Sequence, residues 1–213
     1  MSVAIAALLL TTAVPQARAR TPDLCEPRDT RVAVHYPITG YWMIPRPGRC
    51  ATQRTVEAIH RIGADTLVTF GPRFSPGIDP EVGCRACYRA PWKVRKTYTY
   101  VTSERFSPAF AERTFQRDGR TFYQVRLPKN DLVLVVSDGD GLGALMAEAA
   151  AYGMKVYPGL PAAPQDPAKT WLPDPRHDAA VAAFTARVLT DDRTRYGTSG
   201  AFGGVYQSFE LTL

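Results

Sequence analysis

The chain has 213 residues, 45% of them hydrophobic and 22% charged, and carries a formal net charge of +6. These values are typical of a globular protein and exclude a disordered chain, and the length is sufficient for one sizeable hydrophobic core. One domain is therefore expected.

The N-terminal segment has the pattern of a secretory signal peptide. An apolar run, Val3 to Val14, is followed by the small-x-small sequence Ala17-Arg18-Ala19, although no Lys or Arg precedes the run. A membrane-spanning helix needs roughly 20 apolar residues, and Pro15 and Gln16 interrupt this run too early. We therefore predict a signal peptide over 1–19 and a secreted or extracellular bacterial protein that keeps no stable membrane span after processing.

Four cysteines in an exported chain favour disulfides. Cys25 and Cys50 are expected to tether the mature N-terminus to the loop after the first strand, which leaves Cys84 and Cys87 to pair locally. The alternatives for the latter pair are a zinc knuckle and a redox motif. Zinc would need two more soft ligands at similar spacing, and a redox motif should open a helix directly after a strand. We therefore predict no metal site there, and no cofactor.

The densest basic cluster is Lys93-Val94-Arg95-Lys96, which Tyr98 and Tyr100 follow. Basic and aromatic residues together are typical of a groove for nucleic acid or anionic glycan, while a solvated loop or edge strand is the simpler interpretation. Export and the lack of any nucleic-acid-binding motif argue against a nucleic-acid partner.

The first half of the mature chain begins with a strand–helix–strand pattern. Residues 38–44 form an apolar, aromatic run that Pro45 ends. Residues 52–62 repeat apolar side chains at helical spacing, with Thr52 as the expected N-cap, and 64–71 form the next strand after Gly63. Short joints between these elements predict a right-handed βαβ unit with parallel strands.

Residues 72–131 interrupt this rhythm and are predicted to be a β-rich insertion that overhangs the ligand end of the sheet. A strand is expected over 97–102. Residues 114–117 and 121–125, joined by Asp118-Gly119, predict a β-hairpin with a primed turn. A further short strand is expected over 132–136.

The C-terminal half contains a helix over 142–152, a strand over 154–161, a helix over 179–189 and a last strand over 202–211. Asp138 and Asp140 precede the first of these helices. A calcium loop would need a further acidic ligand in step and a Glu where residue 149 is Ala, so N-capping by one of the two aspartates is the favoured interpretation.

Four segments, 38–42, 63–68, 150–160 and 202–206, together resemble the bacterial domain-of-unknown-function family 4434, which is related to TIM-barrel glycoside hydrolases. The resemblance implies an α/β fold of (β/α) TIM-barrel type. Only the first four βα units are present, and a complete barrel takes about 250 residues and eight strands. We therefore expect 20–213 to be a partial barrel, a fragment or a half that self-associates through open sheet edges.

The same resemblance implies that Glu210, at the end of the fourth strand, is a general acid/base. Retaining hydrolases use a second carboxylate about 5 Å away, which would come from a seventh strand that this chain lacks. In addition, Phe209 stands where many such enzymes have Asn. The alternative for Glu210 is a solvated side chain at a strand end.

Further residues near the strand ends are of types that stack on sugars or hydrogen-bond to them, with core packing as the alternative for the aromatics. They are Tyr41, Trp42, Arg73, Tyr157 and Gln207. Alternation along the last strand places Gln207 on the face opposite Glu210. The leading hypothesis is a secreted glycoside-hydrolase-like domain acting on carbohydrate; the alternatives are a non-catalytic carbohydrate- or cell-surface-binding domain and an inactive truncated fragment.

Overall fold

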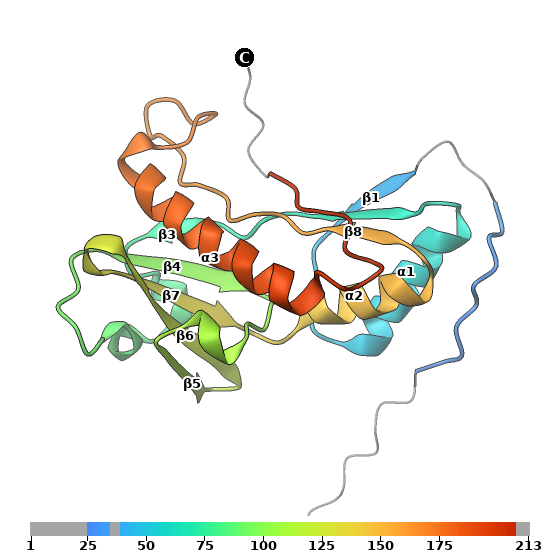
Figure 1. Ribbon diagram of the computed structural model, residues 1–213, viewed down its shortest axis with the longest axis horizontal. Helices are drawn as coiled ribbons and strands as arrows, with labels where there is room; N and C mark the ends of the chain where they lie inside the picture. The colour runs from blue at the N-terminus through green and yellow to red at the C-terminus, as the bar shows by residue number, and fades with distance from the viewer. Residues whose placement is uncertain (1–24, 35–38, 208–213) are drawn as a thin grey trace, which may run out of the picture.

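The computed structural model describes residues 25–34 and 39–207, and their strands form two separate sheets (Figure 1). Long helices pack on both sheets. Short 3-10 turns lie in the connections, at η1 (Pro80–Val82), η2 (Arg85–Tyr88), η3 (Pro108–Phe110), η4 (Pro128–Asn130) and η5 (Pro175–His177).

The first sheet is parallel and has the order β1 (Gly40–Met43), β2 (Thr66–Thr69), β8 (Lys155–Tyr157). Helix α1 (Arg49–Arg61) connects β1 to β2, so the predicted βαβ unit with parallel strands is confirmed. Helix α2 (Gly141–Ala151) packs beside α1, and the two helices enclose a core with the sheet that contains Val56, Leu67 and Leu145. Gly48 rather than Thr52 is the N-cap of α1, because the Thr52 hydroxyl donates to the Gly48 carbonyl from inside the helix.

The second sheet is mixed and has the order β3-β4-β7-β6-β5. Its strands are β3 (Phe74–Pro76), β4 (Thr97–Thr102), β5 (Arg113–Arg117), β6 (Arg120–Leu127) and β7 (Asp131–Ser137). β4 and β7 are parallel, and the other neighbours are antiparallel. The predicted hairpin is confirmed as β5–β6, with Asp118 and Gly119 at φ of 50° and 75° as a primed turn requires.

β7 is the central strand of this sheet, and it is buried at every residue. Val133 and Val135 face helix α3 (Asp178–Tyr196), whose Phe184 is fully buried against them. Leu132, Leu134 and Val136 face the segment around η2 on the opposite side. A strand that is apolar on both faces needs a cover on each, which α3 and the η2 segment provide.

The predicted TIM barrel is wrong. The parallel sheet has three strands, the second sheet mixes parallel and antiparallel pairs, and the described chain shows no barrel closure and no regular βα repeat. The physical reason is β7: it pairs with β4 and β6 in a second sheet, and α3 packs on that sheet. The expected fourth strand, where described, makes only two isolated bridges to the β8 region, Val156 to Phe202 and Gly159 to Tyr206.

Both predicted disulfides are present, Cys25–Cys50 and Cys84–Cys87. The first ties the N-terminal arm to α1, and the second spans η2, so the Cys84 and Cys87 sulfurs bind each other rather than a metal. The described part of the chain contains no helix long and apolar enough to cross a membrane.

Candidate functional site

The carboxyl ends of the parallel strands of both sheets meet at one cavity of about 310 Å³. Figure 1 shows the two sheets side by side, and the residues lining the cavity follow β1, β2, β4, β7 and β8 directly in the chain. Ligand sites in parallel α/β sheets lie at these strand ends, because the connecting loops there are free of pairing constraints. The cavity is therefore the first candidate site.

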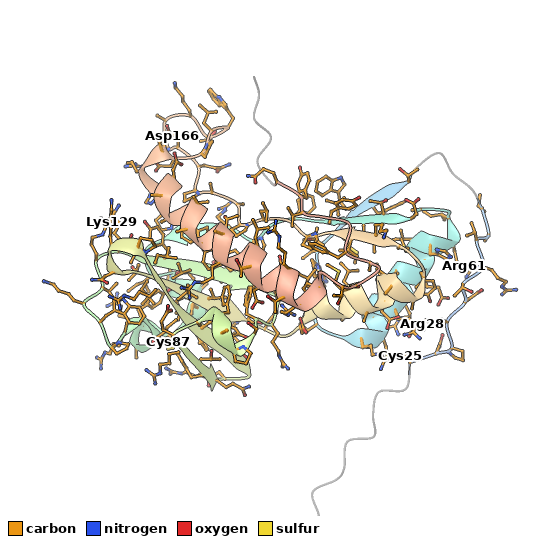
Figure 2. All side chains as sticks on the ribbon, viewed as in Figure 1. Cys25, Arg28, Arg61, Cys87, Lys129 and Asp166 are labelled. Carbon is orange, nitrogen blue, oxygen red and sulfur yellow. A yellow bond between two sulfur atoms is a disulfide. The ribbon has the colours of Figure 1, made fainter. Side chains whose placement is uncertain are left out.

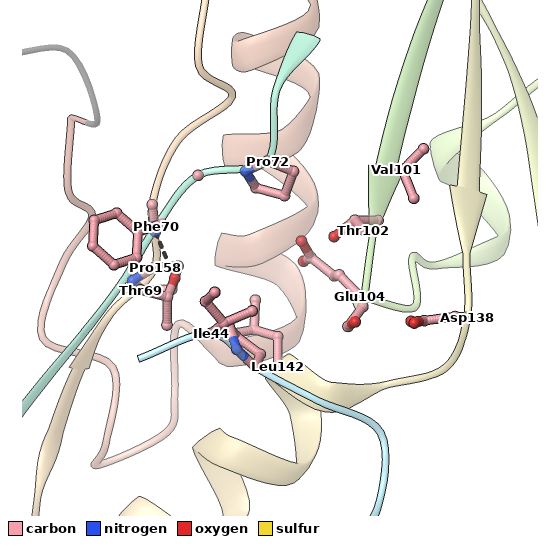
Figure 3. A pocket seen from close by; sticks show the side chains of 14 residues that line it. Ile44, Thr69, Phe70, Pro72, Val101, Thr102, Glu104, Asp138, Leu142 and Pro158 are labelled. Atoms are coloured by element: carbon pink, nitrogen blue, oxygen red, sulfur yellow. Dashed lines mark hydrogen bonds between the residues drawn. The ribbon is translucent and has the colours of Figure 1, made fainter. Parts of the chain in front are cut away.

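The cavity has an apolar wall and a polar wall (Figure 3). Ile44, Phe70 and Pro158 come from the parallel sheet, and Leu142 comes from α2. The polar wall comes from the strand ends of the second sheet, with Thr102, Ser103, Glu104 and Asp138. Asp138 is exposed, whereas Glu104 retains only 5% of its accessible surface.

Behind the polar wall lies a cluster of four carboxyl groups, Glu104, Asp140, Asp191 and Asp192, which we call the acidic cluster. Arg195 of α3 is its central cation: its guanidinium lies 3.1 Å from Glu104 Oε1, 3.1 Å from Asp140 Oδ1 and 3.8 Å from Asp191 Oδ2. Glu104, Asp191 and Asp192 are each at least 95% buried. One partly buried arginine cannot neutralise four carboxylates, so at least one of them is expected to hold a proton.

The proton is assigned to Glu104. Burial raises the pKa of its carboxyl group well above the ordinary value, and the neighbouring Asp192 raises it further by charge and by a hydrogen bond. Burial also raises the pKa of Asp192, but the hydrogen bond from Glu104 acts in the opposite direction there. A protonated Glu104 therefore donates to Asp192 while its Oε1 accepts from Arg195.

Beside the cavity, three aromatic rings form a group that we call the aromatic cluster: Trp42, Phe70 and Tyr206. Trp42 and Phe70 are stacked with centroids 4.9 Å apart, and Tyr206 meets Trp42 edge-on at 4.4 Å. Trp42 is 46% exposed and Phe70 is 55% exposed. Large rings usually lose most of their surface to packing, so two exposed stacked rings mark this surface as a candidate for contact with a ligand.

A second hollow of about 530 Å³ continues from the cavity along α1. Ile44 and Phe70 line both hollows, and Trp42, Arg46, Thr52 and Thr55 line the second. The two hollows together form a groove that passes the aromatic cluster and ends at Asp138, which suits an extended ligand with both apolar and hydroxylated surfaces.

The strand ends approach each other very closely beneath this groove. A Cβ atom on Gly159 would lie 2.1 Å from the Gly71 nitrogen and 2.5 Å from the Thr69 carbonyl oxygen. The Gly159 amide also donates to Thr69 Oγ1 at 2.9 Å. Glycine at this position therefore permits the end of β8 to lie against the end of β2.

Gly159→Ala is expected to lower the free energy of unfolding by about 1–3 kcal/mol, because the backbone atoms that it meets must shift. Gly200→Ala is the control, since a Cβ there meets nothing within 4 Å. Urea denaturation of both variants measures the effect, and equal stability of the two would show that the close approach is not made.

The structure brings some of the predicted ligand-binding residues together and separates others. Trp42 and Tyr157 lie on the same face of the parallel sheet, in register through Val68. Tyr41 packs toward the core on the opposite face, and Arg73 borders a different hollow. Gln207 is exposed. Glu210, the predicted general acid, lies outside the described residues.

Sequence reasoning missed Phe70, Glu104 and the role of Asp138 in the cavity wall. Phe70 directly follows β2, and Glu104 follows β4 by two residues, so the rule that ligand sites lie at the ends of parallel strands could have found both. Applying this rule to Glu104 requires the knowledge that β4 runs parallel to β7.

Comparisons of the chain with protein-family models, with curated proteins and with solved structures gave no match.

Proposed function

We propose that this chain is a carbohydrate-binding domain that holds an oligosaccharide in the groove without hydrolysing it. The observation that carries the proposal is the pair of exposed, stacked rings, Trp42 and Phe70, at the mouth of the strand-end cavity. The C–H faces of sugar rings are apolar and flat, and they pack against aromatic faces while their hydroxyl groups remain free for polar contacts.

Polar groups that can bind sugar hydroxyls line both hollows beside the aromatic cluster. Asp138 and Ser103 line the cavity, and Arg46 lines the groove along α1. A carboxylate and a guanidinium bind hydroxyl pairs more strongly than neutral groups do. The groove therefore combines aromatic stacking with directional hydrogen bonds.

Binding is favoured over hydrolysis by the state of the acidic cluster. Glycoside hydrolysis requires two carboxyl groups that both reach the scissile bond. Glu104 lines the cavity, but one of its oxygens accepts from Arg195 and its proton is directed to Asp192. Among the described residues, Asp138 is left as the accessible carboxylate of the cavity, and one carboxylate is insufficient for either mechanism.

Trp42→Ala tests the proposal. A buried aromatic contact at the centre of a binding site contributes about 2 kcal/mol or more, so the dissociation constant for the best ligand from a panel of neutral and acidic oligosaccharides is expected to rise about 30-fold. The panel is screened with the wild-type chain, and the affinity of each variant is then measured by calorimetry.

Trp171→Ala is the matched control, because Trp171 is 63% exposed and lines neither hollow of the groove. It is expected to bind like the wild type. Equal weakening by both substitutions, or no oligosaccharide binding at all, would contradict the proposed site. Release of new reducing ends by the wild-type chain would contradict the non-catalytic assignment.

A further inference from the structure

The net charge of the chain is concentrated in one region. Residues 73–130 contain twelve Lys and Arg against five Asp and Glu, a surplus of seven, whereas the rest of the chain has fourteen against fifteen. All twelve basic residues are exposed. They belong to the second sheet and its loops, the part of the molecule where Lys129 and Cys87 are labelled in Figure 2. This surplus gives the second sheet a positive field that the parallel sheet lacks.

One face of the β5–β6 hairpin gathers arginines around an aromatic pair. Phe115 and Phe122 stack across the hairpin at 5.2 Å, on the side of the sheet that η2 covers. Because side chains alternate along a strand, the arginines two or four residues from these rings share that face. They are Arg113, Arg117, Arg120 and Arg126, and we call this the arginine face.

Contacts fix the arginine face against its surroundings. Arg113 lies over the Phe115 ring at 5.1 Å, and Arg126 lies over the Trp92 ring at 5.6 Å. Arg117 Nη1 donates to Cys84 Sγ at 3.0 Å, so the exposed Arg85 and Arg89 of the η2 segment border the same face. Arg117 and Arg126 already donate to Asp118, Cys84 and Asn130. Among the described residues, the guanidinium donors of Arg113 and Arg120 therefore remain available to a ligand.

The pairing of Arg117 with Arg120 is unfavourable in the chain by itself. The two arginines are direct cross-strand partners, and like charges in that position repel. Asp118 pairs with Arg117 at 3.2 Å. Among the described residues, Arg85, Arg89, Arg113 and Arg120 make no ion pair. A sequence that places like charges opposite each other, with a compensating partner for only one of them, is expected where a ligand supplies the missing opposite charge.

We propose that the arginine face binds a uronate-rich polysaccharide through its carboxylate groups. Guanidinium binds carboxylate in a bidentate manner. Arg113 and Arg117 stand on either side of Phe115 on β5, and Arg120 and Arg126 stand on either side of Phe122 and Gln124 on β6. The charges along one strand are therefore roughly 14 to 20 Å apart. This interleaving fits a polymer with about one charge on each sugar better than a densely sulfated one. The inference does not rest on the proposed function, because no arginine-face residue lines the groove.

Nucleic acid fits this face less well for two reasons. Unpaired bases require open aromatic rings, and here Arg113 and Arg126 cover Phe115 and Trp92. The two disulfides are also compatible with an oxidising compartment outside the cell, where polysaccharides rather than nucleic acids are the common anionic polymers.

The test uses the full chain, a fluorescent galacturonate oligomer of about ten sugars, and competitors: a neutral glucan, a sulfated dextran and a single-stranded oligonucleotide. The wild type is expected to bind the uronate oligomer, and the logarithm of its affinity to fall linearly with the logarithm of salt concentration. Arg113→Gln together with Arg120→Gln is expected to weaken binding at least tenfold and to flatten this salt dependence.

The matched control is Arg54→Gln together with Arg61→Gln on α1, which removes the same charge from exposed positions outside the arginine face. It is expected to change the affinity less than twofold. Thermal unfolding checks that each variant is folded, and Arg120→Gln alone serves as the test if the pair is not. The proposal is overturned by equal loss in both pairs, by absence of uronate binding, or by stronger competition from the oligonucleotide or the sulfated dextran.

Discussion

Arg195→Met is expected to lower the free energy of unfolding at pH 7 by about 3 kcal/mol. Arg195 is the cation that faces the acidic cluster, with ion pairs to Glu104, Asp140 and Asp191. Its removal leaves buried carboxylates with no compensating charge, and breaking such pairs typically costs about 3–5 kcal/mol. We take the lower end of this range because Asp140 and the edge of Arg195 retain contact with water.

Arg187→Met on the same helix is the control. Arg187 pairs with Glu112 at 3.2 Å, and both side chains are about one-third exposed, so its loss is expected to cost about 1 kcal/mol or less. Urea denaturation measures both. Adding Glu104→Gln to Arg195→Met is expected to recover part of the lost stability, because a glutamine is neutral without having to take up a proton on folding. Equal costs for the two arginines would show that the acidic cluster is not buried as described.

Local patterns in the sequence predicted the local elements of the fold. The β1–α1–β2 unit and the β5–β6 hairpin were predicted because their signals lie within short segments: helical spacing after a Pro-ended strand, and Asp118-Gly119 between two β-prone runs. Short segments did not indicate which strands pair with one another in a sheet. The run at 131–137 is equally suited to any buried parallel strand, and its partners β4 and β6 are selected by packing on both faces.

The candidate site was predicted in part for the same reason. Trp42 was found because it lies in a recognisable strand, and its exposure is a consequence of where that strand lies. Glu104 could not be found from its neighbours, since a single Glu after Thr102-Ser103 is most often solvated. Its burial depends on Arg195, which lies 91 residues further along the chain. Contacts at that separation are decided by the tertiary fold.

The pH dependence of stability is expected to reveal the proton on Glu104. Its pKa is raised in the folded chain because burial and Asp192 disfavour the charged form. A carboxyl group with a raised folded pKa binds its proton more tightly in the native state. Its contribution to stability is therefore complete below the unfolded value near 4.5 and is lost as pH rises through the folded pKa. Between the unfolded and the folded pKa, each rise of one pH unit lowers the free energy of unfolding by up to about 1.4 kcal/mol.

Glu104→Gln keeps a neutral side chain of the same size at every pH, so the variant should lack this loss. Below pH 4.5 its free energy of unfolding is expected to match that of the wild type, and above it the variant should become the more stable protein by a margin that grows with pH. Glu112→Gln, at a partly exposed site on the surface, is the control: it loses a surface ion pair, so its curve should keep the shape of the wild-type curve and lie within about 1 kcal/mol of it. A Glu104→Gln curve parallel to the wild type would place the proton elsewhere in the acidic cluster, and a variant that is less stable at high pH would show that Glu104 is held there as a carboxylate by Arg195.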